Sequence, residues 1–592
     1  DIIDTYRQYR GRGVIAKFEG KNFDEYLNFS RIGDGSLGGK ARGLAFVDLL
    51  IKKYELFDKW PNVVVSIPKT VVISTDIFDE FMETHDLYKI ALRNDLSDED
   101  ILKAFVEARL PSTVLQDLYA FVSMVKGPIA VRSSSKLEDS HYQPFAGVYN
   151  TYMIPKIEND AKSTLRLLTE AIKSVYASVF FKASKAYMTA TSNVIDEEKM
   201  SVILQEVAGK TYEGKYYYPT ISGVGRSINF YPIYPETPED SVVTIAYGLG
   251  KYIVDGAQAL RFCPKYPKKT LQLSTPEITL RDTQKYIYAL DLNPERFIPS
   301  TDDGVNLAKL TIREVEKHSG FKHVASTFDY QNNIVRDGLQ EDGKKLITFS
   351  NILLYNTFPL AEIIQHLMQI SQKEMGNPVE IEFAVNLDVE KNEPAHFYFL
   401  QVRPIVENKE IVHVDIEKIN KEETIIISHS ALGNGLIDNL YDVVFVKPKS
   451  FNPAKNMEIA RELEKINEQF IRENKNYILI GPGRWGSSDP WLGIPVKWAQ
   501  ISAARLIIES GLENYRIDPS QGTHFFQNLT SFRVGYLTIN PYINDGYYDV
   551  DFLMQEESKF EDEYIKHVCF QKPCITMIDG KTNTGIVFKP KT

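Results

Sequence analysis

The stretch Val379-Glu380-Ile381-Glu382-Phe383-Ala384, followed after a turn by Phe397-Tyr398-Phe399-Leu400-Gln401-Val402-Arg403-Pro404, is the part of the sequence that best indicates the fold. Apolar and acidic residues alternate in the first run, which predicts a strand with Glu380 and Glu382 on one face. The turn-forming residues 390–394 predict a hairpin that brings Gln401 near this acidic pair. Two carboxylates about 7 Å apart on a strand face can hold Mg²⁺ and the phosphates it bridges. A solvated acidic face is the alternative interpretation.

Strand-like and helix-like segments alternate through the rest of the chain. Short apolar runs predict strands at 63–68, 129–132, 202–206 and 242–247, besides 379–384 and 397–402. Apolar residues that return every three or four positions predict helices at 43–54, 162–181, 305–318 and 497–510, and a polar helix is expected at 454–475. This mixture indicates an α/β or α+β fold in several lobes. We expect three blocks, at residues 1–200, 201–408 and 409–592.

Composition excludes several classes of protein. The 592 residues predict about three to five domains. With 68 basic and 79 acidic residues the net charge is −11, the wrong sign for a chain that mainly coats nucleic acid. No apolar stretch suits a membrane span, and the N-terminus has no secretory pattern. Three cysteines without paired spacing indicate neither a disulfide scaffold nor a zinc site. We therefore expect a cytoplasmic protein without a nucleic-acid or membrane partner.

Two further motifs suit anionic ligands. In Gly33-Asp34-Gly35-Ser36-Leu37-Gly38-Gly39-Lys40 a glycine-rich loop precedes a predicted helix, so backbone N–H groups and Lys40 can approach phosphate oxygens. In Ala130-Val131-Arg132-Ser133-Ser134-Ser135 an apolar strand delivers Arg132, whose guanidinium can hold phosphate by two parallel hydrogen bonds. A flexible turn and a serine-rich turn are the respective alternatives.

The last block contains a glycine-rich loop and two histidines of interest. The loop, 481–493, carries Arg484, Trp485 and Trp491, and either binds a small anionic or sugar-like ligand or uses its indoles as packing anchors. A neutral imidazole can attack phosphorus, so His524 and His429 are candidate phosphoryl acceptors. A hydrogen-bonded structural histidine is the alternative for both.

Five motifs occur in an order that resembles the nucleotide-binding half of phosphoenolpyruvate synthase and pyruvate phosphate dikinase. They are Gly38-Gly39-Lys40, Val131-Arg132-Ser133-Ser134 with Glu138-Asp139 and Phe145-Ala146-Gly147, Gly248-Leu249-Gly250, Glu380-Ile381-Glu382-Phe383, and Leu400-Gln401-Val402-Arg403-Pro404. The resemblance implies an ATP-grasp-like pair of lobes, formed by the first two blocks and closing on Mg²⁺ and ATP, followed by a smaller α/β domain.

The same resemblance implies roles for individual residues. Lys40 and Arg132 would contact phosphates, Glu380 and Glu382 would hold magnesium or the nucleotide, and Gln401 would complete the site. Gln205 and Glu206 would end a strand beside the adenine. The order Gly522-Thr523-His524 is similar to the family's phosphorylated-histidine motif, which favours His524 as a catalytic residue beside Arg132.

These inferences lead to two hypotheses about function. The first is an ATP-dependent phosphotransferase with ATP and Mg²⁺ as cofactors and a small molecule or a protein as phosphoryl acceptor. Phosphoryl transfer requires mainly cations and correct placement around the phosphates, which Lys40, Arg132 and the acidic strand would supply. The second is a non-enzymatic ATP-binding sensor or regulatory subunit.

Overall fold

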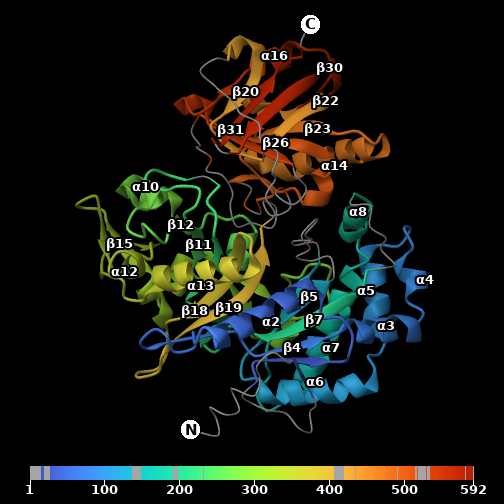
Figure 1. The fold of residues 1–592 in the computed structure, drawn as a ribbon, viewed down its shortest axis with the longest axis vertical. Helices are drawn as coiled ribbons and strands as arrows, with labels where there is room; N and C mark the ends of the chain where they lie inside the picture. Colours follow the sequence, from blue (N-terminus) through green and yellow to red (C-terminus); the bar gives the residue numbers. More distant parts are fainter. Residues whose placement is uncertain are drawn as a thin grey trace. The chain divides into compact units, whose positions relative to one another are not determined.

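The computed structural model (Figure 1) describes residues 15–18, 27–135, 149–190, 198–230, 232–405, 419–433, 435–487, 489, 491–513, 517, 529, 534–580 and 582–590. These residues form a mixed α/β fold with several sheets, which confirms the expected fold class at this level. The chain divides into two compact units. Unit 1 comprises Asp1–Ile228, Glu239–Ile253 and Gln258–Ile405; unit 2 comprises Asn229–Pro238, Val254–Ala257 and Val406–Thr592.

The first sheet of unit 1 has six strands in the spatial order β1-β2-β4-β7-β5-β6. The bounds are β1 Ala16–Lys17, β2 Phe29–Ile32, β4 Thr70–Ile73, β5 Ile129–Ser135, β6 Thr151–Ile154 and β7 Met200–Glu206. Strand β7 runs antiparallel to both β4 and β5. Helix α7 (Ala161–Ser178) packs against β5 and β6 through a buried apolar face. The other helices of this part of the chain are α3 Thr75–Thr84, α4 Tyr88–Ala91, α5 Asp98–Glu107, α6 Ser112–Met124 and α8 Lys182–Ala190.

The second sheet of unit 1 also has six strands, in the order β12-β11-β10-β18-β19-β3. The bounds are β3 Val63–Ser66, β10 Ile221–Arg226, β11 Val242–Ala246, β12 Leu260–Phe262, β18 Val379–Asn386 and β19 Ala395–Pro404. Strand β3 comes from early in the chain and pairs in parallel with β19. Unit 1 also has two smaller sheets. One contains β8 Lys210–Tyr212, β9 Tyr216–Tyr218, β13 Tyr286–Asp291 and β14 Leu307–Thr311. The other contains β15 Ala325–Asp329, β16 Ile334–Asp337 and β17 Lys344–Ile347.

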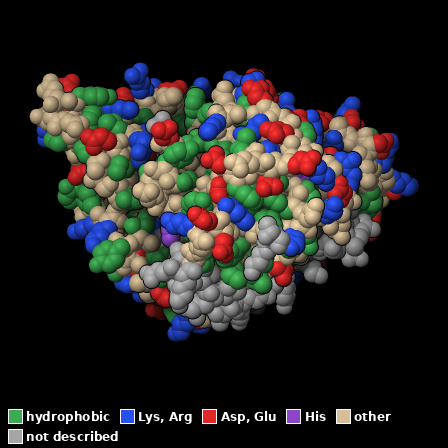
Figure 2. Space-filling model, turned by 90° about the horizontal axis from the view of Figure 1, so that it is seen from above, with side chains coloured by type: hydrophobic (Ala, Val, Ile, Leu, Met, Phe, Trp, Pro, Cys, Tyr) green, Lys and Arg blue, Asp and Glu red, His purple; other side chains and the backbone are tan. Residues whose placement is uncertain are grey.

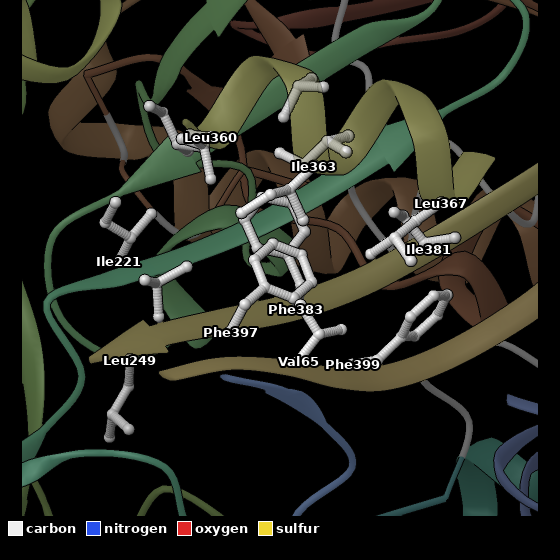
Figure 3. Packing of buried hydrophobic residues seen from close by; sticks show 14 of the residues in the cluster. Val65, Ile221, Leu249, Leu360, Ile363, Leu367, Ile381, Phe383, Phe397 and Phe399 are labelled. Carbon is white, nitrogen blue, oxygen red and sulfur yellow. The ribbon is translucent and has the colours of Figure 1, made fainter. Parts of the chain in front are cut away.

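The apolar face of β18 and β19 forms the centre of the unit 1 core (Figure 3). The rings of Phe383 and Phe397 stack with centroids 5.1 Å apart, and helix α13 (Leu360–Met375) covers them with Leu360 and Ile363. Each fully buried side chain of this size stabilises the fold by roughly 1.5–3 kcal/mol. The expected alternation in β18 is confirmed, because Ile381 and Phe383 lie in this core.

Helix α2 (Gly38–Lys53) contacts both sheets of unit 1, through β5 on one side and β19 on the other. Its buried side chains include Leu44, Val47, Leu50 and Ile51, which return at helical spacing. A Cβ at Gly43 would come within 2.7 Å of the Val402 carbonyl oxygen, so glycine permits close contact with β19. The helix therefore connects the strand that carries Arg132 with the strand that carries Gln401.

Of the expected helices, the one at 305–318 is wrong over most of its length and the one at 497–510 is wrong throughout. Residues 305–318 contain strand β14, which pairs with β13, and only a short helix, α11 (Ile312–Val315), started by a capping box at Thr311 and Glu314. Residues 497–510 contain a 3₁₀ turn, Trp498–Ile501, and strand β26 (Ala504–Ser510). The strand is buried on both faces, so its continuous apolar run has no strand-like alternation. Three other short helices lie between residues 251 and 353: α9 Lys251–Val254, α10 Pro276–Asp282 and α12 Ser350–Leu353.

Unit 2 is built on one large sheet whose described strands follow the order β21-β27-β26-β23-β22-β30-β31-β20-β28, with β29 paired to β30. Strands β27, β26, β23 and β22 are mutually parallel, and β22 is antiparallel to β30. The polar helix expected at 454–475 is present as α14 (Asn456–Arg472). The bounds of the others are β20 Thr424–Ser428, β21 Ser430–Leu432, β22 Gly435–Val446, β23 Tyr477–Pro482, β24 Arg484–Trp485, β25 Gly493–Ile494, β27 Gly535–Ile539, β28 Tyr547–Tyr548, α16 Val550–Gln555, β29 Ser558–Glu561, β30 Ile565–Asp579 and β31 Thr584–Phe588.

Charged side chains of both signs are interspersed over the molecular face drawn in Figure 2. Among the described side chains of that face, Lys and Arg do not gather into a broad basic surface of the kind that coats nucleic-acid phosphates. Among the described residues, no helix combines the length and the apolar character that crossing a membrane requires.

Candidate functional site

Arg132 lies on β5 and its guanidinium reaches from the first sheet of unit 1 to the second. Nη1 donates to Gln205 Oε1 and to the Leu400 carbonyl oxygen, each at 3.2 Å. Nη2 donates to Gln401 Oε1 at 2.7 Å and to Glu382 Oε2 at 3.3 Å. The Arg132 side chain is only 12% exposed. We call Arg132, Gln205, Glu382 and Gln401 the Arg132 cluster; all four were nominated from the sequence, and the fold brings them together.

The predicted hairpin of β18 and β19 is confirmed and places the acidic pair. Glu382 lies opposite Gln401, and Glu380 lies opposite Arg403. The register shifts by one residue between Glu382 and Phe383, which is a bulge in the ladder. Because directly opposite residues of an antiparallel pair share a face, the two acids lie beside Gln401 and Arg403, away from the apolar core.

The Glu380 carboxylate is enclosed by two arginines. Arg226 on β10 donates through Nε to Glu380 Oε2 at 2.6 Å, and Arg403 donates through Nε to Oε1 at 2.9 Å and also through Nη2. All three side chains are buried, and they form one row across β10, β18 and β19. Sequence reasoning missed both arginines. The alternation Gln401-Val402-Arg403 could have indicated Arg403, whereas Arg226 becomes a neighbour only through cross-strand pairing.

The glycine-rich loop is held by protein side chains at its first amides. The N–H groups of Asp34 and Gly35 donate to the Asp76 carboxylate at 2.9 and 3.0 Å, and the N–H of Ser36 donates to Thr75 Oγ1 at 3.0 Å. Burial acts to raise the pKa of Asp76, but the hydrogen bonds it accepts, led by that from Asp34, hold the pKa below its ordinary value. The expectation that these amides face phosphate is therefore wrong for residues 34–36, because they are already bound to acceptors.

Lys40 lies in the first turn of α2 beside the strand that carries Arg132. Its Nζ donates to Ser133 Oγ at 3.2 Å. Ser134 fixes the start of the helix, because its hydroxyl donates to the Leu37 carbonyl at 2.8 Å. Gly38 has φ of +74°, and a Cβ there would lie 1.9 Å from the Ser134 carbonyl oxygen. The close approach that places Lys40 next to Ser133 therefore requires glycine at this position.

The neighbouring residues Gln205 and Glu206 end β7 but have different surroundings. Gln205 is buried; its Nε2 donates to Thr70 Oγ1 at 3.1 Å while its Oε1 accepts from Arg132. Glu206 Oε1 instead accepts the N–H groups of Lys126 and Gly127, at 3.0 and 2.7 Å. The fold thus brings Gln205 into the Arg132 cluster and directs the Glu206 carboxylate to the turn before β5.

Other residues nominated from the sequence lie outside the described residues or in unit 2. Glu138, Asp139 and the run Phe145-Ala146-Gly147 lie outside the described residues, and so does His524. His429 is described: it is exposed and lies between β20 and β21 of unit 2.

The tryptophan loop of unit 2 is anchored by one indole. Trp485 is 2% exposed, donates through Nε1 to the Ile508 carbonyl at 3.1 Å, and covers Gly481, where a Cβ would lie 2.2 Å from the ring. Trp485 N–H also donates to the buried Glu509 carboxylate at 2.9 Å. Trp491 is 75% exposed. The packing-anchor interpretation is therefore confirmed for Trp485 and is wrong for Trp491.

The Arg132 cluster has oxygen donors that suit magnesium. Among the described residues, no group of three or more histidine, cysteine, aspartate or glutamate side chains could hold a metal ion. Magnesium is commonly held by one or two carboxylates together with substrate phosphates and water. The partly exposed Glu382 carboxylate and the adjacent Gln401 amide oxygen fit that mode, in which the nucleotide supplies the remaining oxygens.

Comparison with known proteins gives a family match over most of unit 1. The family described as "Pyruvate phosphate dikinase, AMP/ATP-binding domain" matches residues 34–424. Phosphoenolpyruvate synthase of Aeropyrum pernix is 24% identical over 318 residues, which are 52% of this chain and 33% of that protein. Probable phosphoenolpyruvate synthase of Methanocaldococcus jannaschii is 24% identical over 302 residues, 45% of this chain and 23% of the relative. The uncharacterized phosphotransferase YvkC of Bacillus subtilis is 26% identical over 192 residues, which are 32% of this chain and 20% of that protein. The matched regions thus span a third or less of each relative.

Proposed function

We propose, from the premise that this chain belongs to the pyruvate phosphate dikinase AMP/ATP-binding domain family, that it is an ATP-dependent phosphotransferase with its nucleotide at the Arg132 cluster. The observation that carries the proposal is that Arg132, on the first sheet of unit 1, donates hydrogen bonds to Glu382 and Gln401 on the second sheet. It joins a phosphate-binding cation to oxygen donors suited to magnesium.

The residues of unit 1 have distinct roles in this proposal. Arg132 offers a guanidinium fork that matches phosphate geometry, and Lys40 offers a point charge in the first turn of α2. Gln205 orients Arg132 from β7, because its amide oxygen accepts one of the guanidinium hydrogens. Glu206 keeps its predicted place on the strand beside the adenine, and its carboxylate accepts hydrogen bonds from the Lys126 and Gly127 N–H groups.

Glu382 and Gln401 would hold Mg²⁺ when the nucleotide is bound. The metal supplies charge neutralisation at the phosphate oxygens, which is the main requirement of phosphoryl transfer. Arg132 contributes at the same place by donating hydrogen bonds from a site that is mostly closed to water, where such bonds are stronger than in bulk solvent.

The first experiment is product analysis after incubation of the chain with Mg²⁺ and ATP, with and without pyruvate. AMP with phosphate transfer would support synthase- or dikinase-like chemistry, and ADP alone would support a simpler kinase. Tight binding without either product would contradict the enzyme proposal and favour an ATP sensor.

A matched pair of variants tests the role of Glu382. We expect Glu382→Gln to lower ATP turnover by about a hundredfold or more while nucleotide binding weakens less, because the metal acts mainly on the transition state. Glu390→Gln, in the exposed turn of the same hairpin, is the control and should leave turnover unchanged. Equal turnover in wild type and Glu382→Gln would exclude this role.

We propose His524 as the phosphoryl acceptor, on the basis of its similarity to the family's phosphohistidine motif. Acid-labile phosphate should label wild-type protein and be absent from His524→Ala. His429→Ala serves as the matched variant and should keep the label. Unchanged labelling of His524→Ala would eliminate His524, and loss of label in His429→Ala alone would move the acceptor to His429.

A further inference from the structure

The two carboxylates of β18 have different surroundings although they lie two residues apart on one face. Glu380 is 3% exposed, and both of its oxygens accept charge-assisted hydrogen bonds from Arg226 and Arg403. The Glu382 side chain is 20% exposed, and its described ion pair is the 3.3 Å contact with Arg132. A role shared equally by the two acids does not fit these environments.

Metal coordination by Glu380 would conflict with its present partners. A metal ion at this carboxylate would compete with two buried guanidinium groups for the same oxygens. Breaking a buried ion pair is strongly unfavourable because it leaves a charge uncompensated in a poorly solvated place. A metal ion at Glu382 would compete with a weaker ion pair, since the Glu382 carboxylate is more exposed and its contact with Arg132 is longer.

The Glu380 carboxylate instead fixes the direction of Arg403. Arg403 follows Gln401 by two residues on β19, so both side chains leave the same face of the strand. Two bonds from Arg403 to one carboxylate oxygen set the orientation of its guanidinium. Arg226 holds the other oxygen and so prevents the carboxylate from rotating away.

We propose that Glu380 is a positioning residue that holds Arg403 beside the Arg132 cluster, that Arg226 is its buried counter-charge, and that the metal-binding carboxylate of β18 is Glu382 alone. This inference rests on the proposed nucleotide site and assigns a different role to each of the two acids of β18. It departs from the expectation that both acids bind magnesium.

The test uses the full chain, ATP, and Mn²⁺ as a paramagnetic substitute for Mg²⁺. Calorimetry measures the ATP affinity in EDTA, and electron paramagnetic resonance measures Mn²⁺ affinity in the presence of ATP. For Glu382→Gln we expect Mn²⁺ affinity to fall by about tenfold or more, with ATP binding in EDTA nearly unchanged. For Glu380→Gln we expect the reverse: ATP binding in EDTA falls by about tenfold or more, and Mn²⁺ affinity is retained.

Arg226→Lys provides a milder variant in case Glu380→Gln does not fold. It keeps the positive charge and one donor but loses the fork geometry, so ATP binding in EDTA should weaken while Mn²⁺ affinity stays at the wild-type value. Loss of Mn²⁺ affinity in Glu380→Gln or Arg226→Lys, with ATP binding in EDTA intact, would overturn the inference. Failure of the wild-type chain to bind ATP would instead overturn the proposed function, so the two failures are distinguishable.

Discussion

Glu509, in strand β26 of unit 2, makes the stability of the protein depend on pH in a predictable way. Its side chain is fully buried, with one oxygen accepting from Trp485 N–H and the other accepting from the Tyr536 hydroxyl. Burial raises the pKa of Glu509 to about 7, because loss of solvation outweighs the hydrogen bonds from Tyr536 and Trp485 and the nearby charge of Arg484. The folded protein therefore binds a proton at this site more tightly than the unfolded chain does.

The sign and size of the effect follow from proton linkage. Between about pH 4.5 and pH 7 the folded state keeps the Glu509 proton while the unfolded chain has released it, so the free energy of unfolding falls as pH rises. A pKa of about 7 in the folded state, against 4.5 for the ordinary group, corresponds to roughly 3 kcal/mol of stability. This stabilisation is fully present below the unfolded pKa and is lost by the time the pH passes the folded pKa. Glu509→Gln removes this titration, so its stability relative to wild type should rise by about 3 kcal/mol between pH 4.5 and pH 8.

The assay is urea unfolding of the full chain at pH 5, 6, 7 and 8, followed by tryptophan fluorescence. Three of the four tryptophans, Trp485, Trp491 and Trp498, lie in unit 2 and report on its transition. All other titrating groups are common to both proteins, and any fixed cost of the amide is the same at every pH. Glu468→Gln, an exposed acid on α14, is the control and should show no such trend. A difference between Glu509→Gln and wild type that is constant from pH 5 to pH 8 would refute the reasoning.

Three other substitutions have expected outcomes. Arg132→Lys should weaken ATP binding by about 10- to 100-fold in calorimetry, because an ammonium group cannot reproduce the two parallel hydrogen bonds of a guanidinium. The control Arg166→Lys, on the exposed side of α7, should have no effect. Equal ATP affinities of Arg132→Lys and wild type would argue against phosphate binding by Arg132. Gly38→Ala should destabilise the fold by more than about 2 kcal/mol in denaturant titration, because the new Cβ atom would collide with the Ser134 carbonyl oxygen. Gly214 has a similar positive φ but open space around it, so the control Gly214→Ala should cost only about 1 kcal/mol. Trp485→Phe should cost about 1–3 kcal/mol in denaturant titration, because the smaller ring loses the buried indole hydrogen bond to the Ile508 carbonyl and leaves space over Gly481. Trp491→Phe, at an exposed position, should be neutral, so similar losses for both variants would contradict the anchor role.

Local sequence patterns predicted those parts of the fold that depend on neighbours in the chain. The alternation around Glu382 indicated both the strand and the face on which the acid lies, and the turn at 390–394 indicated the hairpin with Gln401. Where burial on both faces removed the alternation, as in β26, the same reasoning assigned a helix. The first amides of the glycine-rich loop were also misjudged, because the Asp76 carboxylate that binds them is distant in sequence.

The sequence by itself determined the chemical inventory of unit 1: a cationic side chain, Arg132, on an apolar strand, an acidic strand at Glu380 and Glu382, and the order of motifs that marks the family. Only the tertiary structure decided which of these groups meet. Arg132 contacts Glu382 because α2 contacts both sheets, and Glu380 is enclosed by Arg226 because β10 pairs with β18 in one register. Periodicity encodes which face a residue occupies, whereas the partner across that face depends on strand pairing and helix packing between segments that are remote in the chain.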